Sequence, residues 1–433
     1  MERVAFTTLG CKVNQYETEA MSELFKKKGY TIVDSDETAD IYVINTCTVT
    51  SFGDKKSRQM IRKAKHKNKD AIIAVAGCYS QVSPDKVMSI PGVNVVIGTS
   101  DRDRIVDFIE EYKKSRTAVS HVENVMNIKK FEELEIAEYR GRTRAFLKIQ
   151  DGCNRFCSYC LIPYARGPIR SRQPEKVMNQ AKRLADSGFK EIILSGIHVA
   201  SYGVDLGEIN LVDIIEMIQE IDGIERIRIG SVEPTFFTDD VIERLKKYDK
   251  LCRHFHLSLQ SGCDETLKRM NRRYTTSQYE SIVQKLRDAF PKVSITTDII
   301  TGFPGETEEE FNLTYGFLKK LKLSKTHVFK YSPRKGTLAA KYKNQVPPEV
   351  KEERSRKLLA LNLINEKNFI EKFIDSDMKV LFEAEVKGMK GFVEGYTDNY
   401  ISVRANGNDG LIDTITNCKL TKNCGTYACG EIV

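Results

Sequence analysis

Short apolar runs alternate with amphipathic stretches along most of this 433-residue chain, and this alternation constrains the fold more than any other feature. In residues 1–115 the apolar runs have the length of buried strands, and the stretches between them have helical periodicity. A strand–helix rhythm of this kind predicts a doubly wound α/β domain with a mostly parallel sheet. The predicted strands are Val4–Thr8, Ile41–Ile44, Ala71–Val75 and Val93–Ile97.

The rhythm returns with longer units after a charged, mostly polar segment at 116–138, which we expect to be a linker. Residues 139–373 alternate strand candidates with helices and end in a long charged helix from Pro347 to Phe373. These successive units predict a partial (β/α)6 barrel, an open relative of the TIM barrel. The strand candidates are Ala145–Gln150, Glu191–Leu194, Arg226–Ile229, His254–Leu259, Ser294–Ile300 and Thr326–Tyr331.

From residue 374 to 433 the pattern alternates as strands do, with glycine and asparagine at the turns. The predicted strands are Met378–Val386, Gly391–Tyr396, Tyr400–Ala405 and Leu411–Thr416. They suffice for a small antiparallel β-barrel of a size used for RNA binding, although residues 376–433 carry slightly more acidic than basic side chains. Three cysteines here are interpreted either as buried strand residues or as an additional metal site: Cys418, Cys424 and Cys429.

Composition limits the class of protein. The chain is 41% hydrophobic and 30% charged, with a mean hydropathy of −0.38. No window approaches the roughly 18 apolar residues of a membrane span, and the first residues lack the apolar core of a signal peptide. We therefore expect a cytoplasmic protein with no membrane partner. In that reducing compartment, the eleven cysteines are expected to be metal ligands or catalytic thiols rather than disulfide partners.

The net charge of +8 is unevenly distributed. One basic group surrounds the central cysteines and indicates a polyanionic substrate: Arg140, Arg142, Arg144, Lys148, Arg155, Arg166, Arg170 and Arg172. A second basic run is either another contact surface for a polyanion or simply the solvated face of a helix. Its residues are Lys55, Lys56, Arg58, Arg62, Lys63, Lys65, Lys67 and Lys69.

Cys153, Cys157 and Cys160, the central triad, form a C-x3-C-x2-C motif in the loop after the first predicted strand of the barrel. Three thiolates can hold three irons of a [4Fe–4S] cubane and leave the fourth iron open for a ligand. The place also fits, because sites in barrel folds lie at the C-terminal ends of the strands. A structural zinc site would need a fourth ligand from afar, and the candidates are Cys252, His254, His256 and Cys263.

Cys11, Cys47 and Cys78, the N-terminal triad, each follow a predicted buried strand. Loops at the carboxyl ends of parallel strands converge on one crevice, so these three thiols are expected to meet although they are far apart in sequence. Three protein ligands favour a second [4Fe–4S] cluster with an open iron. A three-cysteine zinc site with an exogenous ligand is the alternative.

The central motif, with Phe156 and Tyr159 between its cysteines, resembles that of the radical S-adenosylmethionine superfamily. The resemblance implies that S-adenosylmethionine is chelated and cleaved at the open iron, which makes the central triad catalytic and leaves the difficult chemistry to the cofactor. Residues at the ends of later strands match the expected cofactor contacts less specifically, because each also suits a strand-terminating turn. They are Ser195, Gly196, Glu233, Ser258, Gln260 and Asp298.

Both triads together, followed by a small C-terminal TRAM-like barrel, resemble the methylthiotransferase family over essentially the whole chain. Gly10–Glu17 is most similar to the branch that acts on threonylcarbamoyladenosine in tRNA. Gly152–Cys157 and Pro163–Gly167 are nearer to the tRNA enzymes of the family than to its ribosomal-protein enzyme. The resemblance implies insertion of sulfur and a methyl group at C2 of N6-threonylcarbamoyladenosine next to the anticodon, using two [4Fe–4S] clusters and two molecules of S-adenosylmethionine.

The implied partners are the anticodon stem-loop of tRNA, an electron donor such as flavodoxin or ferredoxin, and a sulfur donor. Other substrates within the family are isopentenyladenosine in tRNA and a ribosomal protein. A function of another class also stays open on the residues alone, a zinc-dependent RNA-binding protein without catalysis. Iron and sulfide analysis would distinguish such a zinc protein from an iron–sulfur enzyme.

Overall fold

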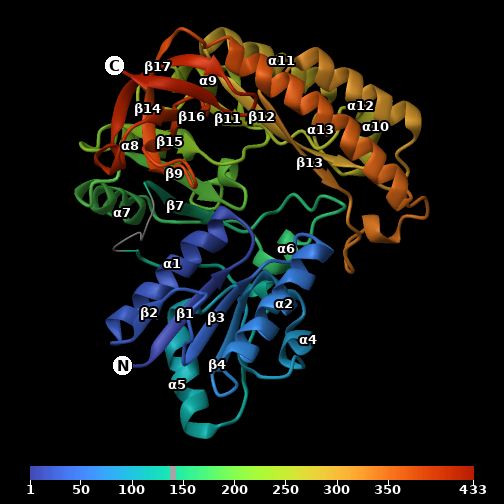
Figure 1. Ribbon diagram of the computed structural model, residues 1–433. Coiled ribbons are helices and arrows are strands. Elements are labelled where there is room, and N and C mark those ends of the chain that lie inside the picture. The colour runs from blue at the N-terminus through green and yellow to red at the C-terminus, as the bar shows by residue number, and fades with distance from the viewer. Residues whose placement is uncertain (137–142) are drawn as a thin grey trace.

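The computed structural model describes residues 1–136 and 143–433, which form three parts (Figure 1). An N-terminal α/β domain lies beneath a larger central α/β domain, and a C-terminal β-barrel packs against the central domain. The boundary expected at 138/139 and the basic residues Arg140 and Arg142 lie outside the described residues.

The N-terminal sheet is parallel, with the strand order β2-β1-β3-β4-β5-β6. Helices α1 (Lys12–Lys27) and α5 (Ile105–Ser115) cover one face, and α2 (Ser51–Lys67) and α4 (Pro84–Met88) cover the other. This arrangement confirms the doubly wound fold. The strands are β1 (Arg3–Thr8), β2 (Thr31–Val33), β3 (Ile41–Thr46), β4 (Ile72–Gly77), β5 (Val93–Ile97) and β6 (Val119–His121).

Two edge strands of this sheet were not predicted. β2 and β6 have three residues each, too few for periodicity to distinguish a strand from a loop. β6 lies in the segment expected to be a linker and pairs in parallel with β5, Val95 opposite Val119. The first part of 116–138 therefore belongs to the N-terminal sheet.

The central domain is an open barrel of parallel strands, as predicted. Strands β10-β9-β7 pair with one another, β11-β12-β13 form a second sheet, and the bridges Ile227–Leu251 and Val232–Leu257 connect the two. A two-residue strand, β8 (Arg170–Ser171), pairs antiparallel with β7. The parallel strands are β7 (Arg144–Asp151), β9 (Glu191–Gly196), β10 (Arg226–Ile229), β11 (His254–His256), β12 (Ser294–Thr301) and β13 (Lys325–Lys330).

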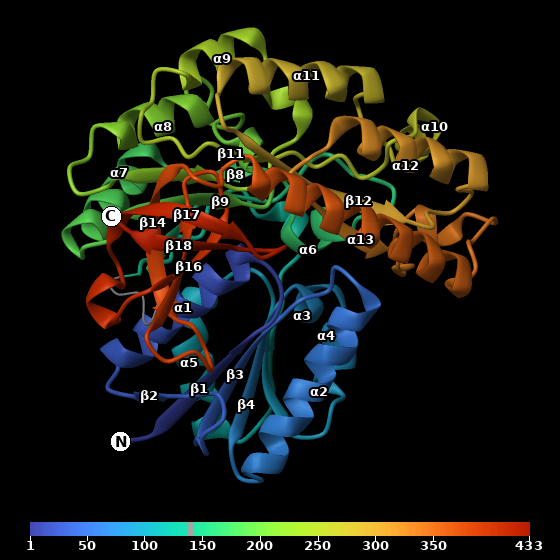
Figure 2. The ribbon, with the colours of Figure 1, turned by 45° about the horizontal axis from the view of Figure 1, so that its top comes forward.

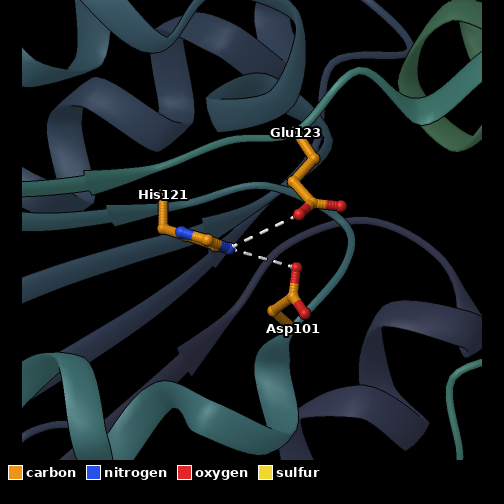
Figure 3. Close-up of side chains that lie close together, drawn as sticks. All are labelled: Asp101, His121 and Glu123. Atoms are coloured by element: carbon orange, nitrogen blue, oxygen red, sulfur yellow. Dashed lines mark ion pairs between the residues drawn. The ribbon is translucent and has the colours of Figure 1, made fainter. Parts of the chain in front are cut away.

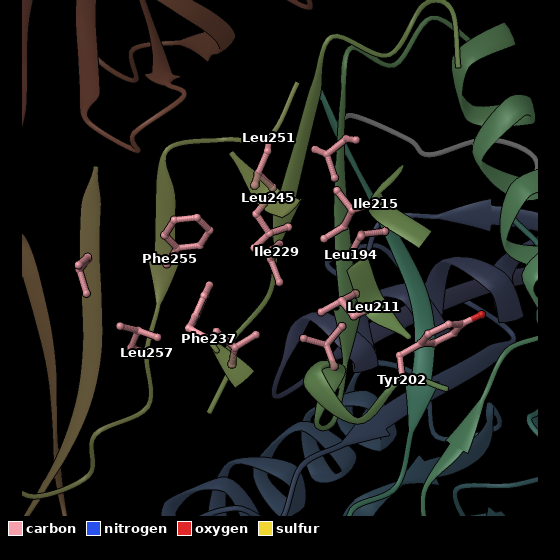
Figure 4. Close-up of a cluster of buried hydrophobic side chains, with 14 of the residues drawn as sticks. Leu194, Tyr202, Leu211, Ile215, Ile229, Phe237, Leu245, Leu251, Phe255 and Leu257 are labelled. Atoms are coloured by element: carbon pink, nitrogen blue, oxygen red, sulfur yellow. The ribbon is translucent and has the colours of Figure 1, made fainter. Parts of the chain in front are cut away.

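Helices line the outside of this barrel (Figure 2). Their apolar faces and the strands share one core, in which Leu194 and Ile229 of the sheet meet Leu211, Ile215 and Leu245 of the helices (Figure 4). The helices are α6 (Ile162–Arg166), α7 (Pro174–Asp186), α8 (Leu211–Gln219), α9 (Asp239–Leu245), α10 (Asp264–Arg269), α11 (Thr276–Ala289), α12 (Glu308–Leu321) and α13 (Pro348–Glu371). Helix α13 confirms the predicted long charged helix.

The C-terminal segment closes into a barrel with the strand order β14-β15-β16-β18-β17. Neighbouring strands are antiparallel except β16 and β18, which run parallel. The predicted strand Leu411–Thr416 is correct only at its last two residues, which begin β17. Before them the Asn408 side chain accepts from Gly410 N at 3.0 Å and caps a 3-10 turn that ends at Leu411. The strands are β14 (Asp377–Glu385), β15 (Phe392–Thr397), β16 (Ser402–Asn406), β17 (Ile415–Asn423) and β18 (Ala428–Ile432).

Two arginines of β10 attach the C-terminal barrel to the central domain. Arg226 donates to the carbonyl oxygens of Tyr396 and Lys379 at 3.0 and 2.8 Å. Arg228 donates to that of Asp398 at 3.0 Å. In the residues that the structure describes, no helix combines the length and the apolar character needed to cross a membrane.

Candidate functional site

The N-terminal triad lies at one edge of the N-terminal sheet. Cys47 and Cys78 come directly after β3 and β4, and Cys11 follows the end of β1 by three residues; the three strands are neighbours in the sheet. The loops pack closely: a Cβ on Gly10, whose φ is +110°, would lie 2.9 Å from Cys47 Cβ and 3.1 Å from Cys47 Sγ. Only glycine allows this approach without strain. The convergence expected from strand order is therefore present.

Arg166 joins this triad to the central domain. It lies at the end of α6, the short helix that follows Cys160, and its Nε donates to Cys78 Sγ at 3.3 Å. Burial raises the pKa of the Cys78 thiol to about 11, while the Arg166 charge acts in the opposite direction. Arg166 also donates to Asn14 Oδ1 at 2.7 Å, so a residue of the central domain holds two elements of the N-terminal site.

A buried charge network surrounds Arg166. Glu17 of α1 accepts from Arg166 and Lys148 and also pairs with Arg102, while Asp151 lies 2.6 Å from Lys148 Nζ. Burial opposes ionisation of Glu17, but the three cations outweigh it and lower its pKa to about 2. Both carboxylates are therefore ionised at neutral pH, and the network fixes α1 against β7.

The central triad occupies the loop between β7 and α6. Gly152 begins this loop with φ +75°, and a Cβ there would lie 1.8 Å from the carbonyl oxygen of Pro168. Cys153 N donates to Gly167 O at 3.0 Å and Cys160 N to Cys157 O at 2.9 Å, which folds the loop back on itself. Burial raises the pKa of Cys160 to about 12. The loop thus presents three partly buried thiols at the C-terminal end of the first barrel strand.

The spacing of the thiols tests which metal group each triad fits. Three thiolates on one zinc ion lie about 4 Å apart, because Zn–S bonds are about 2.3 Å long. Neither triad, both within the described residues, has its three sulfurs gathered within 4.8 Å. A cubane needs wider spacing because each thiolate binds a different iron. In the described residues, neither donor set is therefore drawn together as closely as a single zinc ion requires.

Two of the predicted cofactor contacts lie against the central loop. Glu233, after β10, pairs with Arg155 of the loop at 2.6 Å and lies 3.5 Å from Arg272. Arg272 also donates to Cys157 Sγ at 3.4 Å and to the carbonyl oxygen of Ser258 at 3.1 Å. Arg272 was not singled out in the sequence, because nothing local distinguishes it from a surface arginine.

The other predicted contacts are placed by backbone requirements. Ser195 Oγ donates to Leu147 O at 3.3 Å, so this hydroxyl is engaged within the sheet. A Cβ on Gly196 would lie 2.8 Å from Gln150 Oε1. Gln260 has φ +71°, and its N–H donates to Asp298 O at 2.8 Å. Ser195 and Gly196 end β9 and Gln260 follows β11, whereas Asp298 lies in the middle of β12 rather than at its end.

A cavity of about 610 Å³ fills the inside of the open barrel. Alternate residues of β11, β12 and β13 form its wall, including His256, Asp298 and His327, and Tyr396 and Tyr400 of the C-terminal barrel form another side. Lys12, the residue after Cys11, also lines it. The cavity thus touches all three parts of the chain. A volume of this size suits a drug-sized ligand.

Four members of the basic group around the central triad do not face solvent. Arg166 and Arg172 are 0% exposed, and Lys148 and Arg170 are buried in ion pairs with carboxylates. The expectation of contact with a polyanion is therefore wrong for these four side chains, whereas Arg155 is partly exposed and Arg140 and Arg142 lie outside the described residues. They pair with acids far away in sequence, such as Glu17 with Arg166, which local charge counting does not detect.

The basic run of α2 behaves differently. Lys63 and Lys67 pair with Asp36 at the surface, whereas Phe52 is 72% exposed beside Lys55 and Lys56. In the part of the chain that is described, neither Lys55 nor Lys56 has an acidic partner. This face, just after the Cys47 loop, combines an exposed aromatic ring with unpaired cations.

Asp101, His121 and Glu123 form a further cluster of polar side chains (Figure 3). His121 Nε2 lies 3.3 Å from Asp101 Oδ2 and 4.0 Å from Glu123 Oε1. The imidazole also stacks on Phe108 with ring centres 4.7 Å apart. Ion pairing and stacking account for this group.

The remaining cysteines are mostly core residues. Cys252, Cys263 and Cys418 are buried. Cys424 and Cys429 face each other across the β17–β18 turn with their sulfurs 2.9 Å apart. In the described residues, no third His, Cys, Asp or Glu completes a compact ligand set with this pair.

Known proteins match the fold of the chain and the segment that carries the central triad. Residues 147–318 match the Radical SAM superfamily, and residues 3–98 match an uncharacterised protein family, UPF0004. The radical S-adenosylmethionine methyltransferase TsrM from Kitasatospora setae, solved with cobalamin and a [4Fe–4S] cluster bound, superposes with a TM-score of 0.57 at 16% identity, covering 78% of this chain and 77% of that chain. The chain is a radical S-adenosylmethionine enzyme, a class whose cofactors are S-adenosylmethionine and a [4Fe–4S] cluster.

Relatives that match over nearly the whole length narrow the class. The chain is 46% identical to the threonylcarbamoyladenosine tRNA methylthiotransferase MtaB of Bacillus subtilis, over 100% of this chain and 97% of that protein. It is 40% identical to MtaB of Aquifex aeolicus, over 94% and 97%. It is 38% identical to tRNA-2-methylthio-N(6)-dimethylallyladenosine synthase of Clostridium tetani, over 98% and 95%. The chain belongs to the tRNA methylthiotransferase family.

Proposed function

We propose that this enzyme adds a methylthio group to C2 of N6-threonylcarbamoyladenosine, next to the anticodon of tRNA, and consumes two molecules of S-adenosylmethionine. The observation that carries the proposal is the contact between the N-terminal triad and the helix that follows the central triad. Arg166, on the helix that follows Cys160, donates to Cys78 Sγ at 3.3 Å. Methylthio transfer needs a sulfur-bearing site next to a radical-generating site, and this contact keeps two such sites side by side.

The two triads have separate roles in the proposal. The central triad and the N-terminal triad each hold a [4Fe–4S] cluster. When bound, these groups and S-adenosylmethionine supply the radical that removes the C2 hydrogen and the sulfur that replaces it. The contacts assigned to S-adenosylmethionine are Ser195, Gly196, Glu233, Ser258, Gln260 and Asp298.

The protein's own residues bind and orient the substrate. The barrel cavity receives the target base and excludes water from it. A base of the anticodon loop leaves its stack at a cost of at most a few kcal/mol, because the loop is single-stranded. The exposed face of α2 at Phe52, Lys55 and Lys56 offers stacking and phosphate contacts near the N-terminal triad.

The substrate assignment rests on two supports. Two relatives named for threonylcarbamoyladenosine are 46% and 40% identical to this chain, against 38% for the Clostridium tetani relative named for dimethylallyladenosine, although a third MtaB, from Thermotoga maritima, is 36% identical. Lys12 brings a cation into the cavity, which suits a substituent that carries a carboxylate better than an apolar one.

The proposal extends to partners and organisation. An electron donor such as flavodoxin or ferredoxin and a sulfur donor complete the reaction, and the enzyme works in the cytoplasm. The assigned parts are a methylthiotransferase domain at 1–115, a linker at 116–138 that first adds the edge strand β6 to this domain, a radical domain at 139–373 and a TRAM domain at 374–433.

Mass spectrometry of tRNA nucleosides tests the function. We expect a strain without the gene to accumulate N6-threonylcarbamoyladenosine and to lose its 2-methylthio derivative, and the gene to restore it. Purified, anaerobically reconstituted enzyme should perform the same conversion. If the methylthio group persists in the deletion strain, or is lost from dimethylallyladenosine instead, the proposed substrate is wrong.

A further inference from the structure

The barrel cavity contains a cation that its own lining does not neutralise. Asp298 lies 3.2 Å from His256 Nε2, and Glu366 lies 2.8 Å from Lys325 Nζ, so the carboxylates of the lining are paired within it. Lys12 lines the same cavity without an ion pair to any described residue. An ammonium group placed in this way has no carboxylate within ion-pair distance among the described residues.

The wall behind Lys12 is also positive. Arg144, Arg226 and Arg228 share Glu191 as a common partner, and Arg144 pairs in addition with Glu383. Three guanidinium groups therefore face two carboxylates. Their excess charge adds to that of Lys12.

Tyr400 shows the effect of this charge on a neutral group. Burial favours the neutral phenol, but Arg144 and Lys12 outweigh it and hold the pKa of Tyr400 below its usual range. A hydroxyl whose proton is loosened by nearby cations is a strong hydrogen-bond donor toward an anion.

The position of Tyr400 is fixed. Its ring stacks on Tyr396 and His254, with centres 4.9 and 4.6 Å away, and the Arg228 guanidinium lies 4.6 Å from its centre. Arg144 Nη1 donates to its oxygen at 3.3 Å. The cavity thus presents a rigid donor from the C-terminal barrel together with an ammonium group from the N-terminal domain.

We propose that Lys12 and Tyr400 bind the carboxylate of the threonylcarbamoyl group and thereby select this nucleoside. The inference rests on the proposed function. The carboxylate is an anion that both unmodified adenosine and dimethylallyladenosine lack. Because Lys12 follows Cys11, a substituent held by Lys12 also places the base beside the N-terminal triad, which carries the sulfur to be transferred.

The test compares two RNAs on each protein. Reconstituted wild-type enzyme and Lys12→Gln are titrated anaerobically with anticodon stem-loops that carry threonylcarbamoyladenosine or unmodified adenosine, and fluorescence anisotropy gives the affinities. We expect wild type to prefer the modified RNA and Lys12→Gln to lose about 10-fold of that preference, the size of one charge-assisted hydrogen bond. Because the two affinities are measured on the same protein, their ratio does not depend on how fully that protein is loaded with clusters.

Two further variants sharpen the result. Lys12→Arg retains the charge and should retain the preference. Lys27→Gln, at the exposed opposite end of α1, removes the same charge from the molecule and should leave the ratio unchanged. Tyr400→Phe should reduce the preference in the same direction as Lys12→Gln.

Other anions give different outcomes. Equal loss of affinity for both RNAs would assign Lys12 to a backbone phosphate, and an unchanged RNA ratio with weakened S-adenosylmethionine binding would assign it to the methionine carboxylate. Either result overturns the inference. Failure of wild-type enzyme to modify threonylcarbamoyladenosine would instead overturn the proposed function, so the two failures are distinguishable.

Discussion

Glu17 is the residue that most directly couples the N-terminal domain to the central domain. It is fully buried and pairs with Arg102 of its own domain and with Lys148 and Arg166 of the central domain. Removing one partner of a buried ion network leaves charges that are not compensated, which costs more than the loss of a surface pair. Arg166, which contacts Cys78 of the N-terminal triad, is part of this network.

The Glu17 network predicts a pH dependence of stability. The folded-state pKa of Glu17 is about 2 against an ordinary 4.5, so its carboxylate stabilises the fold above pH 4.5 and loses this effect as the pH falls toward 2. Glu17→Gln should lower the free energy of unfolding by about 3–5 kcal/mol at neutral pH and flatten its decline in acid. Denaturant unfolding at several pH values measures both.

A matched surface variant provides the control. Glu37 pairs with Arg3 at the surface and is half exposed, so Glu37→Gln should change the free energy of unfolding by less than about 1 kcal/mol. An acid slope for Glu17→Gln equal to that of wild type would contradict the role of the network.

At the scale of elements, the loop between β7 and α6 depends on one backbone position. Gly152→Ala would place a Cβ 1.8 Å from Pro168 O, so the loop must move and the three thiols with it. We expect this variant to bind about half the iron of wild type after reconstitution, with the N-terminal triad still loaded. A Cβ at Gly316 in α12 would have no atom within 4 Å, so the control variant Gly316→Ala should bind as much iron as wild type. Full loading of Gly152→Ala would show that the loop tolerates the shift.

Helix α2 presents the surface best suited to RNA. It begins just after the Cys47 loop, and Ser51 Oγ lies 2.9 Å from Ser332 Oγ of the central domain, which holds the start of the helix in place. Phe52→Ala should weaken binding of the stem-loop by about 1–3 kcal/mol through lost stacking. Lys55→Gln should reduce the salt dependence of binding by about one phosphate contact.

Lys63→Gln is the control for this surface, because Lys63 lies on the same helix but already pairs with Asp36. Anisotropy titrations at several salt concentrations measure each effect. Identical behaviour of Lys55→Gln and Lys63→Gln would place the RNA elsewhere.

At the scale of the whole molecule, the C-terminal barrel completes the cavity that the open barrel leaves. Arg226→Gln removes two hydrogen bonds to barrel carbonyls, while Glu191 keeps Arg228 as a partner at 2.7 Å. We expect faster proteolysis between α13 and β14 and a loss of about 1–3 kcal/mol in docking. Arg404→Gln is the control, because its partner Glu394 lies within the barrel itself. The protease should cleave this variant at the wild-type rate. Equal rates for both variants would mean that docking does not depend on Arg226.

The sequence by itself determined what depends on local order. The apolar runs located the barrel strands, and the C-x3-C-x2-C spacing located the central triad, because three thiols within eight residues stay together in any loop conformation. Strand order also allowed the N-terminal triad to be predicted. Short strands such as β2, β6 and β8 were not predicted, because two or three residues are too few to show a periodic pattern of apolar side chains.

Only the tertiary structure decided which charges bind each other and which remain free. Arg166 meets Cys78 and Glu17 across 88 and 149 residues, so a side chain that counts as a phosphate contact in the sequence is a buried link between domains. Lys12 and Tyr400 reach one cavity from opposite ends of the chain. The energy of a charge depends on its burial and its partners, and both are set by packing rather than by local sequence.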